Sequence, residues 1–571
     1  MTVQQIIDGL INGDLPRAIE IFAPELILCA AIVLLLLVRM IFGVQRIPAC
    51  WVALLGTLVA FTGVFAQFMY LKTDLSITGV ADTPVEEFAA RLASAYHLTP
   101  EGVGSVGGFF TDLLMHDQFT LFFRLGLLLF VVLVIALTVL TGIPDNDDGP
   151  DFYTLLLGST VGMMLAVGAN NLLMIFLGIE MMSVPSYAMV GFLKGRRQSS
   201  EAALKYVVYG AGAAGVMLYG LSLIAGILGT LSLPELAGHF VTVMHGETFG
   251  PTNAAAVTLV LGIMMVLVGF AFKLSLVPFH FWCPDAFEGA AAEVGGFLSV
   301  ASKAASFALL VRFLLAFSGP EEVLHGLRVF LGIGLAVIAC LSMTLGNLAA
   351  YTQTNVKRLL AYSTIAHAGY MLMAVSALLI ITDAPATEGW TRSQIFYQSA
   401  RAVEGLMYYL AVYLFMNLVA FSVVAILRNE TYSEEIDSYN GLVHQNPATK
   451  LLCLAMLMAM FSLVGLPPFG GFFAKLQIFT SVLYAADLHW SMWVLLAVAG
   501  ANTVFSLVYY LRVLKAMFIN PEPEERRAIQ TPALVGTYIA LIALPIFLLG
   551  ASPLQSDLTD TANYVARTLF R

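Results

Sequence analysis

Residues 254–281, AAAVTLVLGIMMVLVGFAFKLSLVPFHF, decide the fold class of this chain. The run is apolar over more than the ~20 residues that a helix needs to cross the hydrocarbon core of a bilayer. Near its end it contains Lys273 and Pro278. A mid-span proline frees a backbone carbonyl, which lipid does not tolerate unless protein or an internal cavity satisfies it. The stretch therefore predicts a broken membrane helix that faces the protein interior.

The rest of the chain repeats this apolar character. Of its 571 residues, 59% are hydrophobic and 11% are charged, and the mean hydropathy is +0.87. Soluble domains carry about a quarter charged residues. The sequence therefore predicts an all-α membrane protein of about fourteen transmembrane helices. The count could also be thirteen, because the fourth span is short and the break at Asn170-Asn171 could be a tight turn. The predicted spans are 20–42, 49–71, 119–141, 152–169, 171–192, 201–229, 254–281, 294–318, 326–346, 358–381, 401–427, 451–484, 492–518 and 531–552.

Several other classes of protein are disfavoured. The five cysteines have no CxxC spacing, so a metal or iron–sulfur site is not expected. The GxGxxG pattern at 102–107 lies in the hydrophilic stretch 72–118, without the βαβ unit that dinucleotide binding requires. The acidic turn at 145–149 lacks the closing Glu of a calcium loop. The net charge of −10 is attributed to solvated loops, and the first apolar run is too long for a cleavable signal peptide.

Four lysines and one glutamate that interrupt the apolar spans are the candidate site residues: Glu180, Lys205, Lys273, Lys303 and Lys475. A charge at the centre of a membrane helix costs roughly 2.5–3.5 kcal/mol on insertion scales. Something must therefore compensate these groups, whether pairing, internal water or neutralisation. The alternative for each is a structural role, and a lysine near a helix end can also extend its ammonium group to the interface.

These residues have a pattern that suits proton transfer. Glu180 is followed by polar residues on the same helix face, and Lys205 at the start of the next span is its expected partner. A buried lysine holds its proton less tightly, and a neighbouring carboxylate strengthens its hold. In a series of one carboxylate and several lysines, the proton occupancy of each group can thus be switched by its neighbours. His280 and His367 are candidate relays, for which a packing role is an equal alternative.

A second proline break resembles the first. Leu276–His280 and Leu466–Gly471 both match L-x-P-F, and Pro468, which follows Pro467, lies 190 residues after Pro278. One buried lysine precedes the first break by five residues and another follows the second by seven. Discontinuous helices in two halves of a transporter are typical of an inverted repeat whose ion path runs through the breaks.

Basic residues in the loops indicate orientation, because cytoplasmic loops are enriched in Lys and Arg. With the N-terminus outside, thirteen lysines and arginines fall on the cytoplasmic side and ten on the outer side, and the tight cluster 194–197 is the strongest contribution. The outer set is Arg17, Lys72, Arg91, Arg124, Arg312, Arg328, Arg392, Arg401, Arg567 and Arg571. The prediction is an N-terminus outside the cell.

Long segments of the chain resemble a known family. They include GIEMMSVPSYAMVGFL (178–193), SSEAALKYVVYGAGAAGVMLYG (199–220), FAFKLSLVPFHFWCPDAFEGA (270–290), LSVASKAASFALLVR (298–312), QTNVKRLLAYSTIAHAGYML (353–372) and LVGLPPFGGFFAK (463–475). These are similar to the antiporter-like subunits of proton-pumping NADH:quinone oxidoreductase, respiratory complex I, and specifically to subunit N. The similarity covers residues 115 to 520.

The resemblance implies a fold, a location and a set of roles. The fold would be two inverted five-helix repeats, spans four to eight and nine to thirteen, each with one proline-broken helix, in a bacterial inner membrane. Glu180 would couple the chain to a neighbouring membrane subunit and Lys205 would modulate it. Lys273 and Lys303 would shuttle the proton, and Lys475 would connect to the outer side. NADH, flavin, iron–sulfur clusters and quinone would be used elsewhere in the complex, with none bound by this chain.

The implied domains are 1–118, 119–150, 151–325 for the first repeat, 326–520 for the second, and 521–571. The chain departs from the family pattern after Pro284-Asp285, where Ala292-Glu293 replaces the usual Pro-Thr pair, and in the longer stretch 72–118. Three alternatives stay open: a subunit of a sodium/proton antiporter with the same fold, a purely structural membrane subunit, and the equivalent subunit of a ferredoxin-using relative.

Overall fold

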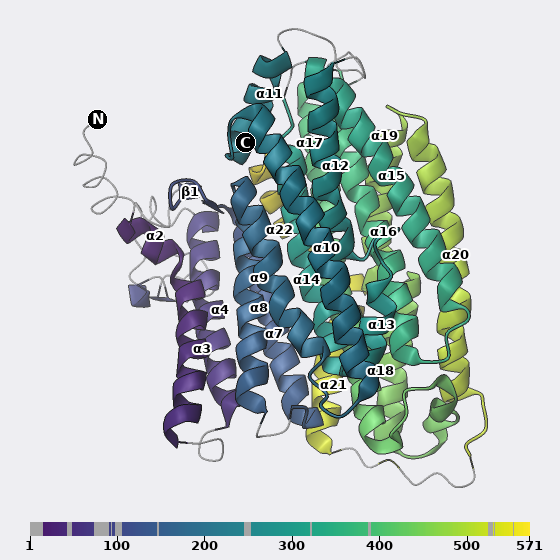
Figure 1. Cartoon of the computed structure of the whole chain (residues 1–571). Helices are drawn as coiled ribbons and strands as arrows, with labels where there is room; N and C mark the ends of the chain where they lie inside the picture. The colour runs from purple at the N-terminus through teal and green to yellow at the C-terminus, as the bar shows by residue number, and fades with distance from the viewer. Residues whose placement is uncertain are drawn as a thin grey trace. The chain divides into compact units, whose positions relative to one another are not determined.

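The computed structural model is almost entirely helical (Figure 1). It describes residues 15–42, 48–73, 91–92, 94–96, 106–144, 148–244, 253–319, 322–385, 390–523, 529, 532–551 and 553–570. Most of the glycine-rich stretch 102–107 and of the acidic turn 145–149 lies outside these ranges. The main elements are α2 Leu15–Ile21, α3 Ala23–Phe42, α4 Ala49–Thr73, β1 Gly107–Phe109, β2 Leu114–His116, α7 Gln118–Thr141, α8 Gly149–Val167, α9 Leu172–Val190, α10 Arg197–Leu228, α11 Leu236–Met244, α12 Ala254–Leu274, α13 Trp282–Gly289, α14 Ala292–Leu315, α15 Glu322–Ala350, α16 Val356–Thr382, α17 Arg392–Thr431, α18 Pro447–Val464, α19 Gly470–Ala486, α20 Ser491–Phe518, α21 Ala533–Ala551 and α22 Pro553–Thr568.

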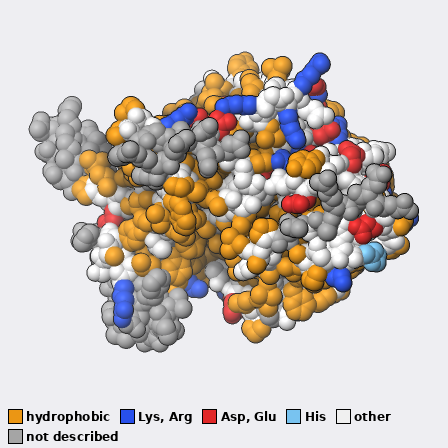
Figure 2. Space-filling model, turned by 90° about the horizontal axis from the view of Figure 1, so that it is seen from below, with side chains coloured by type: hydrophobic (Ala, Val, Ile, Leu, Met, Phe, Trp, Pro, Cys, Tyr) orange, Lys and Arg blue, Asp and Glu red, His pale blue; other side chains and the backbone are white. Residues whose placement is uncertain are grey.

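Fourteen of the described helices are long and apolar enough to cross a membrane, which confirms the predicted count. Large apolar side chains on these helices are exposed. Figure 2, which looks at the molecule from below, shows apolar side chains beside scattered charged groups on that face. In water such surfaces would be a liability. In lipid they are what a spanning helix requires, and the chain is a multi-pass membrane protein.

The described residues form two compact units. Unit 1 comprises 1–189, 221–240 and 304–316, and unit 2 comprises 190–220, 241–303 and 317–571. In unit 1, α3, α4, α7 and α8 pack on one another, and β1 pairs antiparallel with β2. Helices α8 and α9 approach closely at Gly162, where an added Cβ would lie 2.5 Å from the backbone of Met181. Such small residues let membrane helices meet at short distance.

Unit 2 is built around α16, whose most apolar 18-residue segment is entirely buried. Helices α13, α15, α17, α19 and α20 all pack against it. Helix α17 has 40 residues and so extends beyond the predicted span 401–427 at both ends. Helix α10 packs on α12 at Gly220 and Gly269, each of which faces the other helix without room for a side chain.

Two of the predicted spans are broken, as the prolines indicated. Helix α12 ends at Leu274 with Ser275 in the left-handed conformation (φ 59°), and the chain turns before α13. The predicted span 451–484 is two helices: α18 ends at Val464, Gly465 is left-handed (φ 90°), and α19 begins at Gly470. Both C-terminal caps leave the last carbonyls of a half-helix without intrahelical donors, and these carbonyls position the candidate site.

Candidate functional site

Lys303 is held at the first break. It lies in α14, is 1% exposed, and its ammonium group donates to the carbonyl of Leu274 at 2.8 Å and to that of Thr364 in α16 at 3.1 Å. The Leu274 carbonyl is the last of α12. The break thus supplies one of the two backbone acceptors of this buried lysine.

Lys475 is held at the second break in the same way. Its ammonium group donates to the carbonyl of Val464, the last residue of α18, at 2.8 Å. It also lies 4.4 Å from the centre of the Tyr370 ring, within the range of a cation–π contact. Two lysines far apart in the sequence therefore each cap the end of a broken helix.

Lys273 is completely buried on α12. Its ammonium group lies 3.4 Å from the hydroxyl of Tyr206, which it faces as a donor. The Tyr206 ring is stacked on Trp282 with the ring centres 4.1 Å apart, and the indole donates to the carbonyl of Phe272 at 2.9 Å. The aromatic pair therefore fixes the position of the hydroxyl that the lysine meets.

His367 lies in a chain of buried hydroxyl groups in unit 2. Its Nδ1 is 2.6 Å from the hydroxyl of Tyr409 and its Nε2 is 3.2 Å from that of Tyr510. The Tyr510 hydroxyl also bonds to Ser363. Sequence reasoning found the histidine and missed both tyrosines. The signal that could have found them is the phenol group in the middle of an apolar span, since a buried hydroxyl needs a partner.

Lys205 has carboxylate partners. It forms ion pairs with Glu201 at 2.9 Å and with Asp285 at 2.8 Å, and Asp285 also accepts from Arg358 at 2.7 Å. Burial alone would raise the pKa of Asp285, but the hydrogen bonds from Lys205 and Arg358 hold it below its ordinary value. The sequence had pointed to Glu180 as the partner of Lys205. Glu180 is half-buried on α9 in unit 1, so this pair stays a prediction.

The remaining candidates lie at or near the breaks. His280 is half-buried and its ring centre is 4.4 Å from that of Phe281, so its position is that of a turn residue. Pro278 follows the end of α12, and Pro467 and Pro468 lie between α18 and α19. Across the described ranges, no three His, Cys, Asp or Glu side chains gather closely enough to hold a metal ion.

Comparison with known proteins assigns the chain to a family. The sequence model described as "NADH:quinone oxidoreductase/Mrp antiporter, TM" matches residues 169–384 and 386–506, more than half of the chain. A protein of Anaeromyxobacter sp. (strain Fw109-5) named NADH-quinone oxidoreductase subunit N is 40% identical over 445 residues, which cover 76% of this chain and 80% of that one. The chain belongs to the subunit N family of NADH-quinone oxidoreductase.

Solved structures include chains with the same fold. A chain of respiratory complex I from Thermus thermophilus, solved with bound aureothin, superposes with a TM-score of 0.67 at 28% identity, covering 94% of this chain and 98% of that one. A chain of the Mrp complex from Dietzia sp. DQ12-45-1b has a TM-score of 0.69 at 18% identity, covering 96% and 97%. The second likeness shows the shared fold alone.

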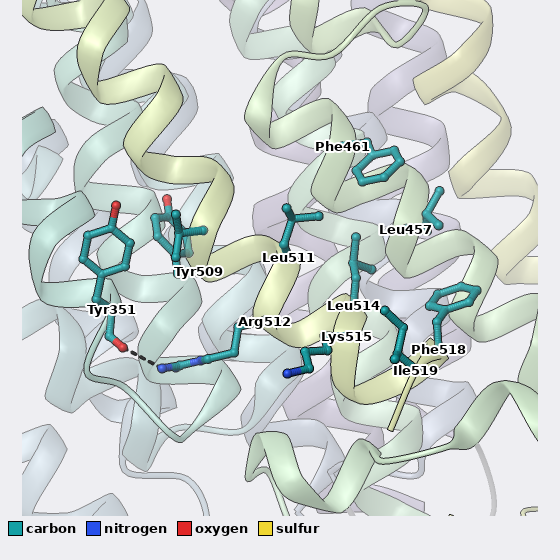
Figure 3. Close-up of a pocket in the computed structure, with 11 residues that line it drawn as sticks. Tyr351, Leu457, Phe461, Tyr509, Leu511, Arg512, Leu514, Lys515, Phe518 and Ile519 are labelled. Atoms are coloured by element: carbon teal, nitrogen blue, oxygen red, sulfur yellow. Dashed lines mark hydrogen bonds between the residues drawn. The ribbon is translucent and has the colours of Figure 1, made fainter. Parts of the chain in front are cut away.

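This subunit N family member also has a pocket of about 730 Å³ that none of the candidate site lysines lines (Figure 3). It lies against α18 and α20 and is mostly apolar, with Arg512 and Lys515 at one end. The Arg512 guanidinium donates to the carbonyl of Tyr351 at 2.5 Å. Because this arginine ties the end of α15 to α20, its first role is structural.

Proposed function

We propose that this chain moves protons across a bacterial plasma membrane as a subunit of NADH:quinone oxidoreductase. One observation carries the proposal: Lys303 and Lys475 are buried and donate to carbonyl groups at the ends of the two broken helices. Membership of the subunit N family supports the same function. The redox cofactors would then lie in other subunits, with energy reaching this chain through its membrane neighbours.

Neutral acceptors are what a proton carrier needs. A lysine paired with a carboxylate in a low-dielectric interior is held in its charged form, because losing the proton would leave the carboxylate unpaired. For Lys303 and Lys475, the described residues place no carboxylate within ion-pair distance, and their hydrogen-bond acceptors are backbone carbonyls. A carbonyl accepts a hydrogen bond from the ammonium form and does not demand a positive charge. These lysines can therefore gain and lose protons.

The proposed path assigns the residues the roles that the resemblance to the family implies. Glu180 responds to the neighbouring subunit and Lys205 modulates it. Lys273 and Lys303 shuttle the proton, and Lys475 delivers it to the outer side. His367 and its tyrosine partners would provide a hydroxyl route within unit 2. The two carbonyl-capped breaks are consistent with the proposed inverted repeats, 151–325 and 326–520.

The proposed orientation places the N-terminus outside the cell. Lys194, Arg196 and Arg197 are all exposed beside the start of α10, as a cytoplasmic cluster should be. Three arginines that we had counted among the outer loop charges are instead buried in ion pairs: Arg124, Arg312 and Arg328. Lys357 of the cytoplasmic set is also buried in an ion pair. Leaving out all four gives twelve basic residues on the cytoplasmic side and seven on the outer side, a stronger bias. Labelling of single cysteines placed at 194 and 570 from either side of the membrane tests this topology.

The decisive experiment replaces Lys303 with alanine in the assembled complex. Proton pumping and NADH:quinone turnover are measured in membrane vesicles, with assembly checked by native gel. Lys450→Ala is the matched control, because that lysine is exposed on α18. We expect K303A to assemble and to lose at least about 90% of pumping while K450A is unaffected. An assembled K303A complex that pumps at the normal rate would overturn the proposal, and sodium-dependent transport would favour the antiporter alternative.

A further inference from the structure

Glu293 is a buried acid that the proposed path leaves unused. It lies in the first turn of α14 and is 1% exposed. Among the described residues, neither of its carboxyl oxygens has a hydrogen-bond partner. Buried polar atoms are almost always satisfied, and a carboxyl group that is not satisfied calls for an explanation.

Its surroundings connect it to the surface through one lysine. Lys357, at the start of α16, is completely buried and donates to the carbonyl of Ala290 at 2.7 Å, three residues before Glu293. The same ammonium group pairs with Glu434 at 2.9 Å. The Glu434 side chain is 11% exposed in the link after α17, so it can meet water. Glu293 is among the charges that act on Lys357, together with Glu434 and Arg428.

The same two helices lead from this cluster to the proposed proton path. On α16, Lys357 is seven residues before Thr364, whose carbonyl binds Lys303. Seven residues are two helical turns on one face, a rise of about 10 Å. On α14, Glu293 is ten residues before Lys303, a rise of about 15 Å. Buried Ser299 and Ser302 lie on α14 between them, and internal water would complete the route.

We propose that Glu293 is the carboxyl group through which this chain takes up protons, an inference that rests on the proposed function. A proton from water first neutralises the Glu434 carboxylate, so that Lys357 no longer has a charged partner. The Lys357 ammonium then passes a proton to the Glu293 carboxylate, and Glu434 returns one to the Lys357 amine. The carboxylic acid formed at Glu293 then gives the proton to the neutral amine of Lys303, which becomes an ammonium. With the N-terminus outside, the starts of α14 and α16 lie on the cytoplasmic side, from which an outward pump must draw its protons.

A structural role for Glu293 makes different demands. A carboxylate can stabilise the first turn of a helix through the backbone N–H groups and the helix dipole, and either glutamate or glutamine can make such contacts. The carboxyl group of Glu293 has no such bond in the described residues. A proton carrier, in contrast, needs a group that can change its charge, which glutamine cannot do.

The test compares Glu293→Gln and Glu293→Asp in the intact complex, with Glu435→Gln as control because that acid is exposed beside Glu434. We expect E293Q to assemble and to pump about tenfold more slowly. The slowing should grow as the cytoplasmic pH rises from about 6 to 8.5, since fewer protons then reach the uptake site. E293D should keep at least a third of the rate, and E435Q should match the parent complex.

The outcomes separate this inference from the proposed function. E293Q pumping at the parent rate while K303A fails would overturn the role of Glu293 alone. Parent rates in both variants would overturn the proposed function as well. A slowing that is the same at every pH would indicate a packing defect and would also overturn the inference. If E293Q does not assemble, Glu434→Gln replaces it, for which a pH-dependent slowing is expected and a parent rate would count against the uptake route.

Discussion

Arg124 in unit 1 and the two lysines at the helix breaks in unit 2 are held in opposite ways. In unit 1, Arg124 on α7 pairs with Glu25 on α3 at 2.6 Å, and both side chains are fully buried. In unit 2, Lys303 and Lys475 are equally deep but donate to backbone carbonyls. The first arrangement fixes a charge, because arginine keeps its proton at any accessible pH and the carboxylate is matched to it. The second allows a charge to come and go. Burial alone therefore does not identify a proton carrier, and the chemistry of its partner does.

The largest effect that we expect comes from breaking the fixed pair. Arg124→Ala would leave Glu25 buried and unpaired, at a cost of roughly 3–5 kcal/mol. The assembled complex should be nearly lost on a native gel. Replacing both residues, Glu25→Leu with Arg124→Met, removes both charges and should restore most of the complex. Persistent loss in the double variant would show that the pair does more than match charge.

Exchanging lysine and arginine separates a charge that must move from one that only has to be present. Lys475→Arg keeps a positive charge and a donor for the Val464 carbonyl but cannot release its proton. We expect the complex to assemble and pumping to fall at least about tenfold. Arg124→Lys also keeps the positive charge, here in the ion pair with Glu25. Its pumping rate, normalised to the amount of assembled complex, should therefore stay within about twofold of the parent rate. Pumping by K475R at the parent rate would place Lys475 outside the path.

Much of this contrast could be predicted from the sequence, and part of it could not. A lysine inside an apolar run indicates a buried charge, and this pattern was enough to find Lys273, Lys303 and Lys475. For Lys273 and Lys475, a nearby proline also indicated a broken helix. Which carbonyl each lysine meets depends on packing between helices that are far apart in the chain. Leu274 and Val464 are apolar residues that carry no signal of this role beyond their place before the break.

The fixed charges were harder to recognise. Arg124 lies inside the predicted span 119–141 but was counted with the basic residues of the outer side, whereas the structure buries it on α7. Asp285 lies in the short helix α13, outside the apolar spans where we looked for charges, yet it joins Lys205 to Arg358. Ion pairs formed between distant segments leave no periodic trace in either partner. Only the three-dimensional arrangement identifies them.

An intermediate effect is expected at Asp285. Like Glu25 it is a carboxylate in an ion pair, but it is only partly buried. Asp285→Asn should slow pumping a few-fold, because Lys205 keeps Glu201 as a second partner. Screening by solvent limits the loss of stability to about 1 kcal/mol or less. The depressed pKa means that the carboxylate is charged throughout pH 6–9 and that its stabilisation is lost only as the pH falls below about 4. The difference in melting temperature between the D285N complex and the parent should therefore be constant over pH 6–9. A difference that changes within that range would contradict this role of the Asp285 carboxylate.

The smallest effect tests whether the hydroxyl chain around His367 belongs with the changeable charges or with the packing. Tyr409→Phe removes the hydroxyl 2.6 Å from His367 while keeping the ring, at a cost of about 1 kcal/mol. Tyr397→Phe on the same helix is the control, since that ring is exposed and contacts the Arg567 guanidinium through its face. If His367 carries protons, Y409F should slow pumping about two- to threefold with normal assembly, because one ring nitrogen loses the partner that sets its tautomer. If the hydroxyl only fills space, Y409F and Y397F should pump alike, and Lys303 and Lys475 would have to exchange protons by a route that does not pass through the histidine.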